Sequence, residues 1–507
     1  MKKASFAAIL AATALMLTAC SPGSDSNDSG SPNTGTTDLK IGNFLDVNSW
    51  DPALADIGFD GPYLSAVYDP LVALDSDGNP IPALATDWKV SDDFLTVTMN
   101  LRTDAKFSDG EAFDAKAAVA SLKHLKAGPR SGEAYLSVAS FTAVDDDTVE
   151  FALTRRDDTL LYFMGLGRSY MMSPSAITAN SLKDAPVGSG PYTLEASTSV
   201  AGAEYHFAKV ADHWDSKTYP FTTLTIFPII DATARHNAML SGQINVNFAN
   251  ATDIPQAEEN GWNVASKVSG WVGLQFIDRT GATLKPLGDE RVRQALNYAF
   301  DGASILQSIG SGAGAASNQV FPAGGTIDDK SLDDMYAYSV EKAKALLAEA
   351  GYADGFALNM PMSPVFQTWQ AVAEQSLAAI GVTVTWDDMQ QPDYQLNAPT
   401  YPMFITFLAM DSNPLATVAR QVTSAQWFNP APQYDQFPDV KALVDEISTS
   451  QGDDQLKAVG ELDTLLTKKA WWSVWYQAEN TYFSSDGITV TPVTGMMFPT
   501  LRYIQQG

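Results

Sequence analysis

Histidine is the first side chain to consider for metal binding or acid–base chemistry, and the chain has only His124, His206, His213 and His236. His206 and His213 are seven residues apart. That spacing does not place both on one helix face, as a spacing of four would. We interpret the four as surface or hydrogen-bonded structural histidines rather than metal ligands. We therefore expect no metal and no cofactor.

One acidic stretch imitates the start of a calcium loop. It reads DSDGNP over residues 75–80, but its sixth position is Pro80 where a glycine is needed. Its twelfth position is Thr86 where a bidentate glutamate is needed. We expect a hairpin turn here instead, after the apolar run at 71–74.

Short motifs that mark common catalytic sites are absent from the sequence. There is no GxSxG, no GxxxxGK, no HExxH and no CxxC. We therefore predict that the protein is not an enzyme, and a surface hydrolase is a distant alternative. A structural or adhesive surface protein is another alternative, and it would need no cleft.

Aromatic residues offer a different chemistry, the binding of a small molecule. The chain has 11 Trp, 18 Tyr and 24 Phe, and most of them must pack in the core. Trp50, Trp271, Trp369 and Trp427 lie in segments where we expect loops. Aromatic faces combined with a few polar groups suit a small-molecule cleft.

The chain is strongly acidic. Its 507 residues include 31 Lys+Arg and 59 Asp+Glu, a formal net charge of −28. This balance argues against a nucleic-acid partner, because phosphate binding needs clustered cations, and it disfavours adsorption to anionic lipid. Apolar residues make up 45% of the chain, so its length predicts roughly two to four domains with large cores.

The first twenty residues have the pattern of a secretory signal. Lys2 and Lys3 precede an apolar stretch at 6–17 that is too short to span a bilayer. The sequence LTAC at 17–20 resembles a bacterial lipobox, in which the cysteine is acylated, for example with palmitate. We predict a signal peptide at 1–19, lipid attachment at Cys20 and a flexible tether at 20–37. The alternative is an ordinary secretory signal that happens to end in cysteine.

The elements that must position a site alternate along the chain. Alternating apolar side chains predict strands at 95–101 and 148–153, and further strands are expected at 358–360, 382–386 and 404–408. Helical spacing after Asp114 predicts a helix, and others are expected at 289–300, 339–350 and 439–448. The fold class is therefore mixed α/β.

Seven motifs, in order along residues 40–480, resemble those of one bacterial family. They are WDPA at 50–53, VYDPLVAL at 67–74, PALATDW at 82–88, LRTDAKFSDGEAF at 101–113, GSGPY at 188–192, DERVRQAL at 289–296 and EKAKALL at 341–347. With these motifs the chain resembles the extracellular solute-binding proteins of family 5. That family comprises the peptide, nickel and opine receptors of ABC importers.

The resemblance implies an α/β, two-lobed fold of the periplasmic-binding-protein type, with two hinge crossovers. The first lobe would hold residues 38–270 and 477–507, with an extra subdomain near 70–190, and the second lobe residues 271–476. A ligand would bind between the lobes and favour their closure. The implied protein is a monomer that serves the transmembrane subunits of an ABC permease. It would be anchored to the outward face of the cell membrane only by its N-terminal lipid.

The resemblance also implies ligand-binding residues. In peptide-binding members an aspartate pairs with the ligand ammonium group, and Asp411 in TFLAMDSNP matches it. Peptides also add as a strand along a segment that here contains Asn43, Phe44 and Leu45. Asp411 has an alternative interpretation as the cap of a helix or turn before Pro414.

One departure from the family pattern affects the ligand. Short-peptide binders place an arginine in the second lobe to grip the ligand carboxylate, but residues 359–377 contain none. This favours longer peptides held through their backbone, and our prediction is an oligopeptide receptor. The alternative is an oligosaccharide receptor. Trp271, Trp369 and Trp427, with Gln275 nearby in sequence, would serve either ligand, and for a sugar they would be stacking platforms. Nickel is disfavoured by the low histidine content.

Overall fold

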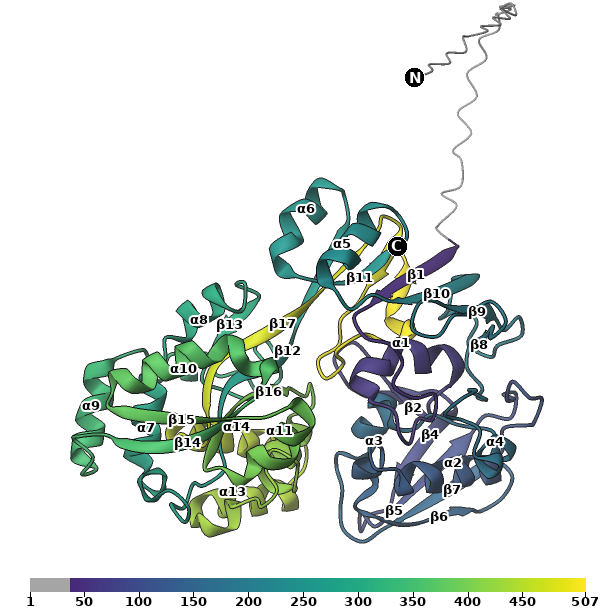
Figure 1. Ribbon diagram of the computed structural model, residues 1–507. Coiled ribbons are helices and arrows are strands. Elements are labelled where there is room, and N and C mark those ends of the chain that lie inside the picture. The colour runs from purple at the N-terminus through teal and green to yellow at the C-terminus, as the bar shows by residue number, and fades with distance from the viewer. Residues whose placement is uncertain (1–36) are drawn as a thin grey trace, which may run out of the picture. The chain divides into compact units, whose positions relative to one another are not determined.

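The computed structural model describes residues 37–507 (Figure 1). The strands are β1 Asp38–Asn43, β2 Val72–Leu74, β3 Pro80–Pro82, β4 Ala85–Val90, β5 Thr96–Leu101, β6 Val138–Ala143, β7 Thr148–Leu153, β8 Tyr192–Leu194, β9 Tyr205–Lys209, β10 Thr223–Pro228, β11 Val246–Ala249, β12 Asn263–Phe276, β13 Gly314–Ala316, β14 Phe356–Met362, β15 Val382–Asp388, β16 Met403–Ala409, β17 Ser473–Ser484, β18 Ile488–Val490 and β19 Ile504–Gln506. The helices are α1 Ile57–Val67, α2 Ala115–Ala127, α3 Leu160–Phe163, α4 Pro174–Ala179, α5 Ala232–Leu240, α6 Ile254–Glu259, α7 Glu290–Tyr298, α8 Gly302–Ser308, α9 Val340–Glu349, α10 Gln367–Ala379, α11 Gln391–Asn397, α12 Pro414–Val418, α13 Pro438–Thr449 and α14 Gly452–Lys468. The lipid-attachment, signal-peptide and tether predictions fall at 1–37, and residues 1–36 lie outside the described part.

Most of the predicted elements are confirmed. The predicted strands correspond to β5, β7, β14, β15 and β16, and the predicted helices to α2, α7, α9 and α13. Local chemistry explains their starts: the Asp114 carboxylate accepts a hydrogen bond from the Ala117 amide at 2.8 Å and so caps α2. The DSDGNP stretch forms the turn between the paired strands β2 and β3, as expected. The loop predictions for Trp271 and Trp369 are wrong, because Trp271 lies in β12 and Trp369 in α10.

The largest sheet contains nine strands of the described chain. Its order is β16-β12-β17-β11-β1-β10-β9-β8, and β13 pairs with β17. A separate four-stranded sheet has the order β4-β5-β7-β6. In the large sheet β1 runs parallel to both β10 and β11, whereas β12 is antiparallel to β16 and β17.

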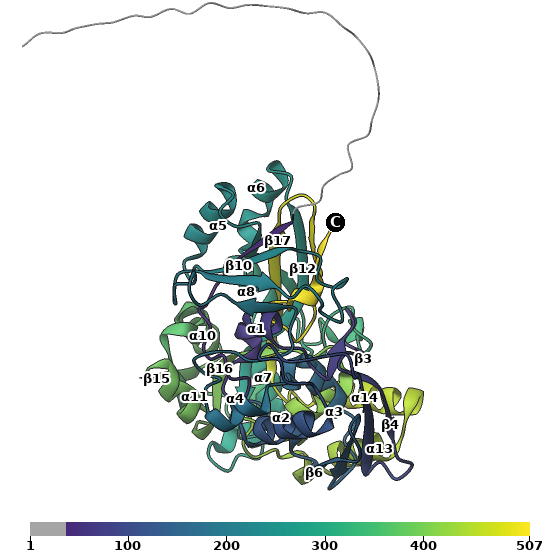
Figure 2. The same cartoon turned by 90° about the vertical axis from the view of Figure 1, so that its right-hand side faces the viewer.

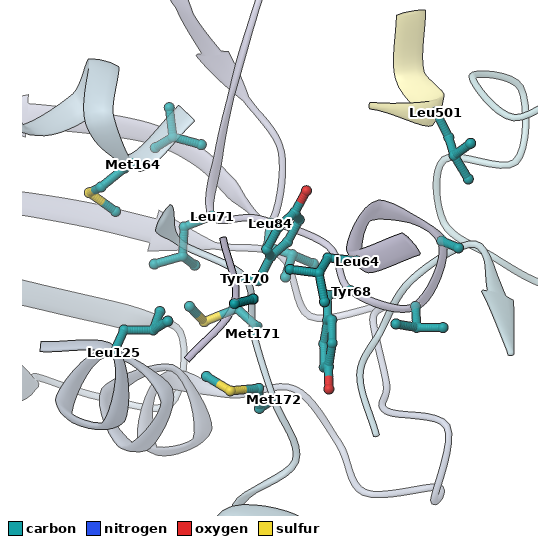
Figure 3. Close-up of a cluster of buried hydrophobic side chains, with 14 of the residues drawn as sticks. Leu64, Tyr68, Leu71, Leu84, Leu125, Met164, Tyr170, Met171, Met172 and Leu501 are labelled. Atoms are coloured by element: carbon teal, nitrogen blue, oxygen red, sulfur yellow. The ribbon is translucent and has the colours of Figure 1, made fainter. Parts of the chain in front are cut away.

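A first hydrophobic core gathers buried residues from β1 to β11, from Tyr482 of β17 and from the chain after β17. Figure 3 shows part of it, where Leu64 of α1 and Tyr68, just after that helix, lie near Tyr170, Met171 and Met172. Leu501, close to the C-terminus, belongs to the same core. We call the elements around this core the first lobe.

A second core is made only of residues between Val268 and Tyr476. It includes the fully buried Trp271, Trp471 and Trp475. The elements around it form the second lobe, and β12 and β17 run between the two lobes (Figure 1). Figure 2 shows β12 and β17 beside each other, in agreement with their pairing. Trp271 pairs with Gln477, so the two crossovers are coupled strands of one sheet.

No helix among residues 37–507 combines the length and the apolar character that crossing a bilayer requires.

Candidate functional site

A cavity of about 700 Å³ lies between the two lobes. Phe59, Arg130 and Glu133 line it from the first lobe. Phe407 and Trp427 line it from the second. Because both lobes contribute to its wall, any movement about β12 and β17 would open or close it.

Much of the cavity wall is apolar. Beside Phe59 and Phe407 it contains Phe428, Met496 and Phe498. Phe428 is held in place from behind, because the buried Gln275 side chain donates to its carbonyl oxygen at 3.3 Å. Such a wall can bury apolar parts of a ligand, and the polar groups among them would fix its orientation.

Charged side chains of both signs also line the cavity. Arg168 and Glu133 of the first lobe form an ion pair at 2.5 Å, and Arg130 pairs with Asp56 at 3.2 Å. Burial lowers the pKa of Arg168, although the charge of Glu133 opposes that effect. The wall can therefore meet both an ammonium group and a carboxylate.

The charged residue of the second lobe in this wall is Arg420. Its Nη1 lies 3.4 Å from Oδ1 of Asp411, whose exposed fraction is 1%. Tyr162 of the first lobe donates its hydroxyl to the same oxygen at 3.3 Å. Oδ2 of Asp411 has no hydrogen-bond partner among the described residues. Asp411 is therefore a buried carboxylate behind the cavity wall, and one of its oxygens is unsatisfied.

Burial and charge act against each other in this pair. Burial raises the pKa of Asp411, and the Arg420 charge only partly offsets that rise. Burial by itself would lower the pKa of Arg420, but the charges of Asp411 and Glu133 outweigh it and raise that pKa. Asn413, rather than Asp411, caps α12, because its side chain accepts from the Leu415 amide at 2.9 Å.

Strand β16 presents a free edge to the cavity, since it is the last strand of the large sheet. The Tyr394 hydroxyl donates to the Ile405 carbonyl, so this carbonyl points away from β12. Residues two apart in an antiparallel strand present their backbone groups to the same side. Phe407 and Ala409 therefore direct their amide and carbonyl groups to the free edge, and both line the cavity.

The segment predicted to receive a peptide strand lies behind this wall. Asn43 is buried, and its side chain donates to the carbonyl oxygens of Leu45 at 3.1 Å and Phe59 at 3.4 Å. The Leu45 carbonyl also accepts the Tyr63 hydroxyl at 3.1 Å. The Phe44 ring packs edge-on against Phe59, with 5.5 Å between centroids.

The other predicted ligand residues lie in three different places. Trp427 lines the cavity, is 41% exposed and stacks on Phe404. Trp271 is buried in the second core, beneath the wall. Trp369 donates its ring nitrogen to the Tyr476 hydroxyl at 3.2 Å and packs on the same core. Trp427 is thus the one of these residues that lies in the wall. Gln275 supports Phe428 of the wall from behind, and Trp271 and Trp369 pack in the second core.

Sequence reasoning missed the charged residues of the wall. Glu133, Arg168 and Arg420 are far apart in the chain and belong to no motif that the sequence analysis identified. No local signal in the sequence could have suggested these buried pairs. Among the histidines, His213 lies 3.0 Å from the buried Asp69 carboxylate. The described residues contain no group of three or more potential ligands that could hold a metal ion.

The fold and the cavity between lobes define a two-lobed binding protein. The structure superposes on that of the binding protein DppA from Helicobacter pylori in complex with the peptide STSA. Their TM-score is 0.77 at 20% identity, and the match covers 93% of this chain and 98% of the other. This likeness confirms the two-lobed α/β fold.

The sequence places the chain in a family. A family model described as bacterial extracellular solute-binding proteins, family 5 Middle, matches residues 79–475, and the chain belongs to this family. Heme-binding protein A of Haemophilus influenzae is 30% identical over 409 residues, which cover 71% of each chain. Glutathione-binding protein GsiB of Salmonella paratyphi A is 28% identical over 344 residues. The match covers 66% of this chain and 65% of the length of GsiB.

Proposed function

We propose that this chain is the solute-binding lipoprotein of an ABC importer, that it captures oligopeptides between its lobes, and that it passes them to a membrane permease. Residues 38–270 with 477–507 would move as one lobe and 271–476 as the other. Lipid on Cys20 would hold the protein, as a monomer, at the outward face of the cell membrane. Membership of the family supports the general role.

The observation that carries the peptide proposal is the cavity with an open strand edge. A peptide that pairs with β16 would satisfy its own backbone groups on those of Phe407 and Ala409, whatever its sequence. Its side chains would then lie against the aromatic wall. Two relatives fit this ligand class: GsiB is named for glutathione, a tripeptide, and DppA of Helicobacter pylori holds the peptide STSA.

The charged groups support a peptide with free ends. We place its ammonium group at the unsatisfied Oδ2 of Asp411, because an added donor would remove the cost of that buried oxygen. Arg420 would then shift toward Glu133, whose charge already acts on it. Arg168, which pairs with Glu133, and Arg130, which pairs with Asp56, also line the cavity. Both would attract the peptide carboxylate.

Removing the charge of the peptide ammonium group and that of Asp411, one at a time, tests this placement. Calorimetry would compare the tetrapeptide Ser-Thr-Ser-Ala with its N-acetylated form, on the native chain and on Asp411→Asn. Acetylation should weaken binding to the native chain by about 2 kcal/mol and should have little further effect on Asp411→Asn. An equal loss for both proteins would exclude Asp411 as the ammonium partner.

The second candidate ligand is an oligosaccharide, and the exposed face of Trp427 in the cavity supports it. A thermal-shift series with di- to tetrasaccharides would decide between the two. Stabilisation by sugars and not by peptides would contradict the peptide proposal and support an oligosaccharide ligand. Ligand at a hundred times its dissociation constant should stabilise the fold by about 2.7 kcal/mol.

A further inference from the structure

A second contact joins the lobes, outside the residues that line the 700 Å³ cavity. It is built from Arg156 and Asp158, which follow β7 in the first lobe, and from the end of α13 in the second lobe, at the side that faces the first (Figure 1). Arg156 donates to the carbonyl oxygens of Ser448 at 3.2 Å and Ser450 at 3.0 Å. These carbonyls lie at the C-terminal end of the helix, where such groups lack partners within the helix and favour a cation.

Each side of this contact is held in position by its own lobe. The Arg156 Nε donates to the Asp158 carboxylate at 2.8 Å, and the guanidinium lies over the Phe94 ring at 4.3 Å. Phe94 adopts a φ of 60°, a left-handed conformation that is costly for an aromatic residue. The buried Gln455 of α14 completes the contact, because it donates to Asp158 at 3.0 Å and to the Ile447 carbonyl at 2.9 Å.

The surroundings of this contact are open. Arg156 and Asp158 line both a cavity of about 320 Å³ and another of about 290 Å³. The hydrogen bonds between the lobes therefore border open space on two sides. A polar contact of this kind can break and form again as the lobes move.

We propose that Arg156, Asp158 and Gln455 form a clamp between the lobes that slows the release of the ligand without touching it. The inference rests on the proposed function, because it assumes that the lobes part when the ligand leaves. A contact made only when the lobes are together adds to the stability of the closed state. Arg156 is accordingly a positioning residue for ligand retention.

The test compares Arg156→Gln with Arg155→Gln. Arg155 is the exposed neighbour and has no hydrogen bond or ion pair within residues 37–507, so its variant loses the same charge without losing the clamp. Stopped-flow fluorescence with Ser-Thr-Ser-Ala should show dissociation about tenfold faster for Arg156→Gln and unchanged for Arg155→Gln. Arg156→Lys keeps the charge and a donor, and should restore part of the retention.

A second measurement keeps the inference independent of the peptide. Small-angle scattering without peptide should give a larger radius of gyration for Arg156→Gln than for the native chain and Arg155→Gln. The circular dichroism spectra of the three proteins should be the same, which shows that their secondary structure is unchanged. If both the dissociation rate and the radius of gyration match those of Arg155→Gln, the clamp does not exist. If no variant binds the tetrapeptide, the peptide proposal fails and the scattering result alone decides on the clamp.

Discussion

At the scale of single residues, a buried charge can give a sequence motif a structural role although the motif lies away from the ligand cavity. Arg293 of the DERVRQAL stretch is 1% exposed. It donates to the Leu287 carbonyl at 2.7 Å and to the Lys469 carbonyl at 3.0 Å, and so ties α7 to the loop before β17. Asp463 of α14 is equally buried, but its surroundings are unfavourable, because the charges of Asp328, Asp329 and Asp333 act on it.

The Asp463 carboxyl should make stability depend on pH. Burial, and then the nearby carboxylates, raise its pKa from 3.8 to about 7 in the fold. The folded state therefore binds a proton more tightly than the unfolded state, and this contribution to stability is complete below pH 3.8 and lost as the pH rises through 7. Asp463→Asn should raise the free energy of unfolding at pH 8 by on the order of 3 kcal/mol and leave it unchanged near pH 4.

Urea denaturation at the two pH values would measure this effect. Asp454→Asn, at an exposed position in the first turn of the same helix, should change the free energy of unfolding by less than about 0.5 kcal/mol at either pH. Equal stability of Asp463→Asn and the native chain at pH 8 would show that the buried carboxyl has an ordinary pKa.

At the scale of elements, the β2–β3 hairpin limits how closely the lobes approach. Gly78 at its tip has a φ of 86° and lies against Ser412, which follows β16 in the second lobe. A Cβ atom added at Gly78 would lie 1.9 Å from the Ser412 hydroxyl oxygen and 2.7 Å from its Cβ. The two lobes can reach this arrangement because the hairpin carries no side chain there.

Gly78→Ala should therefore weaken peptide binding by about tenfold or more, because the lobes could no longer meet at Ser412. Gly110→Ala is a matched control, since Gly110 has a φ of 93° and no atom within 4 Å of the added Cβ. Both variants should lose about 1 kcal/mol of stability from the left-handed backbone, but only the first should lose affinity. Calorimetry should also find affinity restored in Gly78→Ala with Ser412→Gly, and the hairpin explanation is wrong if it is not.

The elements themselves were largely predictable, because their signals are local. The alternation along 95–101 and the Asp114 cap each involve neighbours in sequence, and β5 and α2 follow from them. Trp271 was misplaced because a fully buried strand shows no alternation that distinguishes it from a loop between glycines. The wall of the cavity was not predictable, since Glu133 and Arg420 meet only through the tertiary fold. Trp427, by contrast, lies in a segment that the sequence predicts to be a loop, and it lines the cavity.

At the scale of the whole molecule, two cores joined by β12 and β17 form two lobes whose separation can change when a ligand binds. Each core is complete on its own side of these strands, so the lobes can keep their internal packing while their separation changes. The cavity wall, the clamp and the hairpin tip are three places where the lobes meet. A ligand that gains contacts from both lobes would shift the population toward closure in proportion to its differential affinity.

Closure on a ligand is the central claim, and a distance between the lobes tests it most directly. The sequence has one cysteine, Cys20, so Cys20→Ser with Lys123→Cys and Lys344→Cys would carry one dye on each lobe at exposed positions. Single-molecule energy transfer should shift to a shorter distance when Ser-Thr-Ser-Ala is added, and return when the peptide is removed. If a saturating peptide, shown to be bound by calorimetry, left the distance distribution unchanged, the protein would not capture its ligand by closing its lobes.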